Sequence, residues 1–252
     1  MKEKPLISVI LPVHNAATTL EQCVISLLKQ SYKNIEIIAI DDFSSDKSYS
    51  ILKKLKKKSK KIRLYKNVKR YGIAVTLNRA VKKARGSYIT FMDTDDFSSP
   101  LRFKQQLRFL IQNPDVVALG TQCNFINEKD KKIGKSSFPT ENSLIAENPL
   151  HGISMQFETV LINKALLPKD VLKFNVNSNP FIYSDITMKI MSYGKLANLN
   201  SFLHFHRNDP RNYLLDVKKN ILSLIKLWAK HKTLSDYNPP LRSFFSPLIK
   251  SI

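Results

Sequence analysis

The stretch Tyr88-Ile89-Thr90-Phe91-Met92-Asp93-Thr94-Asp95-Asp96 decides the fold prediction, because it joins an apolar strand to a cluster of acids. Three carboxylates within four residues repel one another unless a cation offsets their charge. A hard divalent ion prefers oxygen ligands and completes its shell with substrate phosphates. The alternative is a polar turn that caps the helix beginning at Pro100, and the acids alone do not exclude it.

Two earlier stretches have the same layout. Leu6–Leu11 is a continuous apolar run followed by His14 and Asn15, and Ile35–Ile40 is a second run followed by Asp41-Asp42. Such runs are typical of strands covered on both faces. Amphipathic helices are expected between the strands, over 20–28, 48–58 and 73–84. This alternation predicts parallel βαβ units, and ligands bind beyond the carboxyl ends of such strands.

The rest of the chain is less regular. We expect strands at 62–65 and 116–120, a helix at 100–112, a short run at 157–162, a helix at 184–192, a strand at 196–206, a helix at 213–230 and an irregular, partly apolar tail at 233–252. The length fits one domain with an appendage. We therefore expect a domain over 1–212, divided at residue 122 into a nucleotide-binding half and an acceptor half, with a C-terminal helix and tail over 213–252.

Composition narrows the cellular setting. Cys23 and Cys123 form no disulfide framework and no zinc spacing, so free thiols in a reducing compartment are expected. The sequence shows no signal-peptide core, and no charge-free stretch reaches the roughly 18 residues that a membrane span needs. We expect a cytoplasmic protein, with peripheral contact to the cytoplasmic face of the membrane as an option.

The charge is strongly basic and unevenly spread. The net charge is +21, and residues 47–92 contain 16 Lys/Arg and no Asp/Glu. Such a field attracts nucleotides, acidic lipids or nucleic acid, although a solvated lysine-rich surface explains it equally well. Single-stranded nucleic acid needs aromatic stacking platforms. Residues 47–70 offer only Tyr49 and Tyr65, so no nucleic-acid partner is expected.

Four stretches together resemble the family 2 glycosyltransferases, which have the GT-A fold. Residues 7–15 (Ile-Ser-Val-Ile-Leu-Pro-Val-His-Asn) look like the opening of that family, and residues 26–32 are similar to the end of its first helix. Residues 37–46 resemble its second-strand motif, and residues 84–96 resemble the stretch that ends in its metal motif. The four occur in the right order and spacing over residues 6–115.

The resemblance implies a set of site residues. Pro12, Val13, His14 and Asn15 would line the nucleotide pocket, Asp42 would hold the base, Asp93 would lie near the ribose and the metal, and Asp95 would coordinate Mn²⁺ or Mg²⁺; Arg70, Asn78 and Thr94 complete the expected donor contacts. The family usually has Tyr in place of His14 and Gly in place of Phe43. His14 can still stack on a base, whereas the backbone at Phe43 is less free than at Gly.

In the second half, residues 183–189 look like the Glu-Asp motif of the family, with Ser184 in place of the Glu. Asp185 keeps the acid that would serve as general base, although a lone Asp before a helix is more often a cap. Residues 203–207 resemble the strand that closes the site. His206 would supply a metal ligand and Arg207 a phosphate contact, and His204 and His206 would face the same side of the strand.

The implied reaction is a single, inverting displacement. A sugar would pass from a nucleoside diphosphate, UDP by expectation, to a hydroxyl of a glycan or lipid-linked acceptor, as in the synthesis of bacterial surface polysaccharide or lipooligosaccharide. The sugar is a hexose or an N-acetylhexosamine. Lys69 and Arg70 would help to neutralise the leaving diphosphate. Two alternatives stay open: a nucleotidyltransferase acting on sugar phosphates and a basic nucleic-acid-binding protein.

Overall fold

The computed structural model describes residues 4–207, 215, 217–234 and 237–249. Within these residues the centre of the molecule is one nine-stranded sheet with the order β3-β2-β1-β4-β8-β6-β9-β5, and β7 pairs with β6. Strands β1 (Ile7–Val13), β2 (Ile35–Asp41), β3 (Ile62–Lys66) and β4 (Tyr88–Phe91) are parallel neighbours. Their carboxyl ends therefore meet at one edge, as the βαβ pattern predicts.

The other part of the sheet is mixed. β8 (Leu161–Asn163) runs antiparallel between β4 and β6 (Val116–Ile126), while β9 (Lys195–His206) runs parallel to β6. The short strands β5 (Phe97–Ser98) and β7 (Lys132–Lys135) pair antiparallel with β9 and β6. This sheet confirms the predicted α/β class, with helices on both faces.

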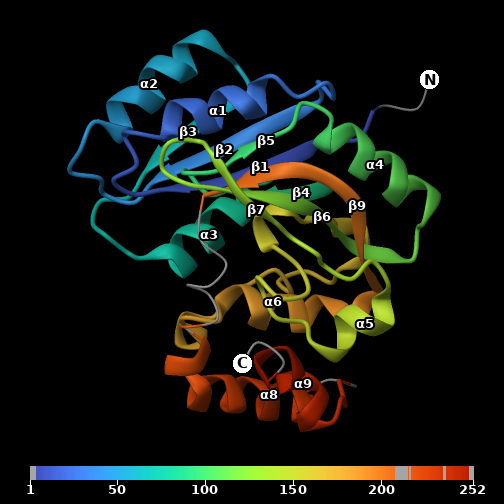
Figure 1. The fold of residues 1–252 in the computed structure, drawn as a ribbon. Helices are drawn as coiled ribbons and strands as arrows, with labels where there is room; N and C mark the ends of the chain where they lie inside the picture. The colour runs from blue at the N-terminus through green and yellow to red at the C-terminus, as the bar shows by residue number, and fades with distance from the viewer. Residues whose placement is uncertain (1–3, 208–214, 216, 235–236, 250–252) are drawn as a thin grey trace.

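Helices cover the two faces of the sheet and produce three layers (Figure 1). One apolar cluster joins the sheet to α1 (Leu20–Leu28), α2 (Ser48–Lys58) and α4 (Arg102–Gln112). The opposite cluster joins it to α3 (Ile73–Val81), α5 (Asn142–Glu147) and α6 (Ile182–Ile190). Four short 3₁₀ turns complete the described connections: η1 (Phe157–Thr159), η2 (Lys164–Leu166), η3 (Val176–Ser178) and η4 (Met191–Tyr193).

The C-terminal segment corrects one prediction. Residues 233–252 were expected to be irregular, yet the structure has α8 (Ile221–Leu234) and a further helix, α9 (Leu241–Ile249). Phe244 is fully buried in a third apolar cluster with Leu150, Phe181 and Met188, so α8 and α9 pack beneath α6 (Figure 1). The sequence signal failed because Pro240 precedes the helix, where it is compatible with helix initiation. Tyr213, the expected start of the previous helix, lies outside the described residues.

Other boundaries differ in detail. β6 runs to Ile126 rather than Gly120, and β5, β7 and α5 were not expected at all. None of the helices in the described part of the chain is long and apolar enough to cross a membrane. The division at residues 122 and 212 stays a prediction.

Candidate active site

A cleft of about 740 Å³ opens at the shared edge of β1, β2 and β4. Its volume lies within the range of small-molecule sites in proteins. Nine predicted site residues line it: Pro12, Val13, His14, Asn15, Asp42, Arg70, Asp93, Thr94 and Asp95. Four chain segments far apart in sequence (12–15, 42, 70 and 93–95) therefore meet here because parallel neighbouring strands end on the same side.

Asp42 organises one wall of the cleft. Its Oδ1 accepts from Asn67 Nδ2 (2.6 Å) and from the backbone N–H of Tyr71 (2.9 Å), and its Oδ2 accepts from the N–H of Gly72 (2.8 Å). Burial alone would raise the pKa of Asp42, but these hydrogen bonds outweigh it and lower the pKa. Gly72 has φ 82°, a conformation that favours glycine. Asp42 thus fixes the loop that carries Arg70 and Tyr71 into the cleft.

His14 and Asn15 line the cleft beside Asp42. His14 Nδ1 lies 2.9 Å from the backbone oxygen of Asp42, so this nitrogen donates and the ring is anchored beside β2. Asn15 has φ 48°, and its Oδ1 accepts from the N–H of Ser45 (2.9 Å). Phe43 has φ 59° and a half-exposed side chain, so the position where the family usually has Gly keeps a left-handed backbone here.

Asp93 and Asp95 lie in the cleft among other acids. Burial raises the pKa of Asp95 to about 6, and the charge of Asp96 adds to the rise. Burial and the nearby charge of Glu158 raise the pKa of Asp93 well above its usual value. Oxygen ligands whose charges repel one another are the donor set that a hard divalent cation stabilises. The residues present therefore fit Mn²⁺ or Mg²⁺.

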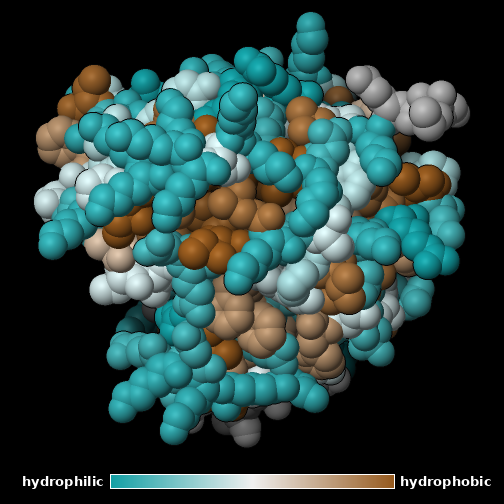
Figure 2. All heavy atoms as spheres, turned by 90° about the horizontal axis from the view of Figure 1, so that it is seen from above, coloured by the Kyte–Doolittle hydropathy of each residue, from teal (hydrophilic) through white to brown (hydrophobic). Residues whose placement is uncertain are grey.

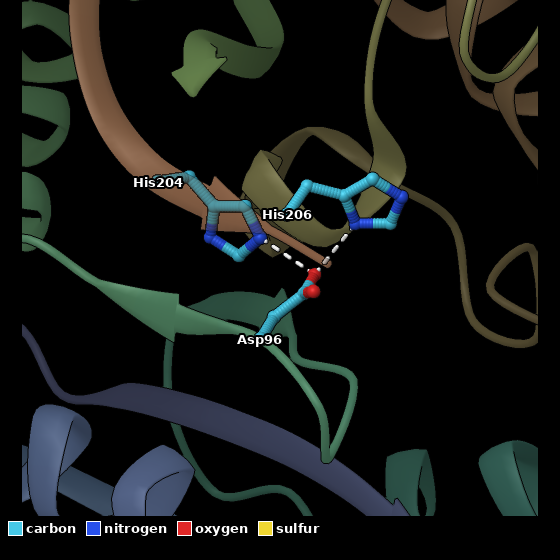
Figure 3. Close-up of side chains that lie close together, drawn as sticks. All are labelled: Asp96, His204 and His206. Carbon is cyan, nitrogen blue, oxygen red and sulfur yellow. Dashed lines mark hydrogen bonds and ion pairs between the residues drawn. The ribbon is translucent and has the colours of Figure 1, made fainter. Parts of the chain in front are cut away.

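Asp96 follows Asp95 in the chain and is buried, and its carboxylate lies next to the rings of His204 and His206 (Figure 3). Its Oδ2 accepts from His204 Nε2 and from His206 Nδ1, each at 2.8 Å, and its Oδ1 accepts from the N–H of Arg207 (2.9 Å). Both imidazoles point toward one carboxylate, which confirms that they share a face of β9. Burial opposes ionisation of Asp96, but the charge of His206 and the hydrogen bond from His204 hold its pKa well below the usual range.

The charges around His206 raise its pKa, whereas those around Asp96 lower the pKa of that carboxyl. Burial lowers the pKa of an imidazole, yet the charge of Asp96 outweighs it and raises the pKa of His206 to about 10. For His204 burial wins, and the pKa is lowered. The three groups lie close enough for one ligand atom from each to surround a cation, with all three atoms within 4.8 Å of one another.

The structure places the Arg207 side chain elsewhere than predicted. Its guanidinium donates to the backbone oxygens of Asp95 and Asn127 (2.9 and 2.8 Å) and pairs with Asp130 (2.5 Å). It does not line the cleft. Because its donors already satisfy protein acceptors, Arg207 fastens the end of β9 to the Asp95 turn rather than reaching a phosphate there.

Three further predicted residues also lie outside the lining of the cleft: His206, which contacts Asp96 as described above, and two residues on the helices α3 and α6. Asn78 donates to the backbone oxygen of Phe174 and accepts from its N–H, both at 2.8 Å, so it holds the segment around residue 174 against α3.

Asp185 is fully buried between α6 and α8, where Lys230 and His231 each approach it at 2.7 Å and Lys189 at 3.1 Å. Burial opposes ionisation, but these partners keep the pKa of Asp185 well below its usual value. The predicted helix cap is also absent, because the N-cap of α6 is Phe181 without a side-chain bond.

Several polar residues beside the site escaped sequence reasoning. Glu158 is buried and accepts from Gln156 (2.7 Å). Tyr183 is partly buried beside Asp93, and desolvation together with the charge of Asp93 raises the pKa of its phenol. Arg102 is fully buried and contacts His204. Neither Glu158 nor Arg102 belongs to a polar cluster at a strand end, so no sequence pattern indicated that they lie beside the site. The alternation of His204 with His206 was the one sequence pattern that pointed to this group of residues.

A parallel sheet with acids at its strand ends, flanked by helices on both faces and followed by mixed strands, defines the GT-A class of nucleotide-sugar transferase folds. Two solved structures share it. S. aureus TarS 1-349 in complex with UDP-GlcNAc has a TM-score of 0.67 at 22% identity, covering 81% of this chain and 58% of that one. Mannosyltransferase PcManGT from Pyrobaculum calidifontis, in complex with GDP-Man and Mn²⁺, has a TM-score of 0.69 at 18% identity, covering 99% and 69%.

The chain belongs to glycosyl transferase family 2, whose family model matches residues 8–166. An uncharacterized glycosyltransferase of Haemophilus influenzae is 45% identical over 162 residues, which are 64% of this chain and 63% of the relative. The match thus spans less than two thirds of that relative. The family match favours the glycosyltransferase interpretation over the nucleotidyltransferase and nucleic-acid interpretations.

Proposed function

We propose that the chain transfers a sugar from a nucleoside diphosphate sugar to an acceptor hydroxyl with a divalent metal ion. The observation that carries the proposal is the meeting of Asp42, Asp93 and Asp95 in one cleft at the strand ends. UDP is the proposed nucleotide. The solved structures of similar fold hold UDP-GlcNAc in one case and GDP-Man in the other, which supports a nucleotide sugar as donor without choosing its base.

Each wall of the cleft has a proposed task. The loop held by Asp42 would receive the base, Arg70 would face the diphosphate, and Asp93 would accept from the ribose. Asp95 and His206 would hold the metal. When bound, that ion would offset the negative charge that develops on the leaving diphosphate. Asp93 and Asp95 would then both be charged, a state that burial and the surrounding acids disfavour without a cation.

We infer an inverting, single displacement, with a glycan or lipid-linked glycan as acceptor. To act as general base, Asp185 would have to leave two lysines and a histidine and reach an acceptor, so we propose that its first role is to anchor α8 on α6. Its action as general base is the testable alternative.

A screen of nucleotide sugars with Mn²⁺ tests the proposal. The correct donor should release a nucleoside diphosphate and should stabilise the chain by about 2.7 kcal/mol at a hundredfold excess over its Kd. Stabilisation by sugar phosphates with release of pyrophosphate would instead indicate a nucleotidyltransferase. The anomeric configuration of the product, followed by NMR, decides between inversion and retention.

We further propose that the basic face binds an anionic bilayer near a lipid-linked acceptor. Lys53, Lys54, Lys56, Lys57 and Lys58 are all exposed on α2. Long hydrophilic side chains spread over the face seen from above (Figure 2). Binding to anionic vesicles should weaken with salt, because surface charges are screened. Equal flotation with neutral and anionic vesicles would contradict it. The C-terminal segment offers less apolar surface for membrane binding than its sequence indicated, because Phe244 is buried.

A further inference from the structure

The carboxylate of Asp96 is saturated by the protein itself. Its Oδ2 accepts from two imidazoles, and its Oδ1 accepts from the backbone N–H of Arg207. The side chain is fully buried and does not line the cleft, in contrast to Asp93 and Asp95. A metal ligand needs a lone pair directed at an open coordination position. Asp96 faces the interior of the protein instead.

A buried arginine determines which nitrogen of the His204 ring carries the proton. Arg102 Nη1 lies 3.3 Å from His204 Nδ1, and a guanidinium nitrogen can only donate. His204 Nδ1 must therefore accept, so the ring proton lies on Nε2. Figure 3 shows the His204 ring directed at the Asp96 carboxylate. A cation on Nε2 would force that proton onto Nδ1, against the guanidinium. Although Asp96, His204 and His206 lie close together, they are not arranged as a metal cage.

Arg102 is itself fixed in place by several hydrogen-bond acceptors. Its guanidinium donates to Thr90 Oγ1 (2.7 Å), Ser98 Oγ (2.8 Å) and the backbone oxygen of Glu158 (2.6 Å), and the residue is fully buried. These acceptors come from β4, β5 and η1. A buried cation of this kind requires a nearby negative charge, and Asp96 supplies it.

We propose that Arg102, His204 and Asp96 form a positioning relay for His206, and that Asp96 is not itself a metal ligand. The relay rests on the proposed metal-dependent function. With His206 Nδ1 on Asp96, the ligand atom left for the metal is Nε2, where the ion would replace the second ring proton. His206 Nε2 now lies 3.3 Å from Gln156 Nε2. Metal-bound histidines generally donate their other ring N–H to a carboxylate, which fixes the ring orientation.

The first test needs no substitution. In metal-free protein labelled with ¹⁵N-histidine, the relay requires His204 to carry its proton on Nε2, which long-range ¹⁵N–¹H correlation spectra distinguish from the Nδ1 form. A proton on Nδ1 would leave Nε2 free as a ligand and would overturn the relay. The spectrum is independent of donor, acceptor and turnover.

The second test measures Mn²⁺ affinity of the full chain, from the electron paramagnetic resonance signal of free Mn²⁺. Asp95→Asn should lose binding, whereas Asp96→Asn should weaken it about 10–100-fold, the usual effect of removing a partner behind a metal ligand. His204→Gln keeps a donor toward Asp96 and should lose less than His204→Leu. Arg63→Met removes a guanidinium paired with Glu36 at the far edge of the sheet and should change nothing.

These outcomes distinguish a failure of the proposed relay from a failure of the proposed metal-dependent function. Loss of binding in Asp96→Asn together with retained binding in Asp95→Asn would place the ion between Asp96 and the two histidines, against the relay. Unchanged affinity in Asp96→Asn would also overturn it. Absence of Mn²⁺ binding by the wild-type chain would instead contradict the metal in the proposed function.

Discussion

Asp95 and Asp185 are aspartates in the two halves of the molecule, and their surroundings are opposite. Asp95 follows a buried strand and lines the cleft, where burial and the neighbouring acids raise its pKa to about 6. Asp185 lies on α6 under α8, where two lysines and a histidine lower its pKa. At a strand end the topology directs a side chain toward the ligand edge, whereas on a helix the packing partner decides.

The largest expected effect is that of Asp95→Asn. Turnover should fall by at least about 10³-fold, the scale on which removal of a key electrostatic group acts. The fold should survive, because the substitution relieves repulsion within a crowded acidic cluster. Initial rates of nucleoside diphosphate release with Mn²⁺, alongside thermal unfolding, measure both. Full turnover in excess EDTA would remove the metal from the mechanism.

Asp42→Asn should act on donor affinity. The amide keeps the shape but loses the charge that receives the N–H groups of Tyr71 and Gly72, and hydrogen bonds to charged groups contribute about 1.5–3 kcal/mol. We expect the Kd for UDP to rise roughly tenfold or more, measured by calorimetry. Glu36→Gln is the matched control, because Glu36 accepts from Ser8 and the N–H of Arg85 but lies outside the cleft. An equal loss in both variants would indicate a general loss of stability.

Asp185→Asn should chiefly reduce stability. It removes the charge that joins Lys230 and His231 to α6, at a cost of about 1.5–3 kcal/mol. Well below the midpoint of unfolding, kcat should stay within a few-fold of wild type. A drop in kcat of about 10²–10⁴ with unchanged stability and donor affinity would restore Asp185 as general base, and would mean that α8 moves during turnover.

The smallest effect is a pH dependence. A carboxyl whose pKa rises on folding contributes stability that is present below its unfolded pKa, here 3.8, and is lost as pH rises through the folded value of about 6. Metal-free wild type should therefore lose stability relative to Asp95→Asn between about pH 4 and pH 6.5. Denaturant unfolding of both proteins at several pH values measures the difference. A constant difference would indicate that Asp95 is not crowded by charge.

The nucleotide-binding edge could be predicted from sequence because each strand there is indicated by a short, local stretch of residues. Apolar runs such as Leu6–Leu11 and Ile35–Ile40 reveal strands, and the parallel arrangement then places the residues after them together. The resemblance to a family supplied the proposed roles. The positions of Asn78, Asp185 and Arg207 could not be predicted, because each depends on a partner 45 or more residues away, such as Lys230 for Asp185.

The loop held by Asp42 has a consequence for how the nucleotide binds. The N–H groups of Tyr71 and Gly72 are tied to a buried carboxylate, so their hydrogen exchange should be slow even without ligand. A wall that is already ordered loses little conformational entropy when a donor enters. Association should then be limited by diffusion and charge steering rather than by loop closure, with an on-rate that falls as salt increases.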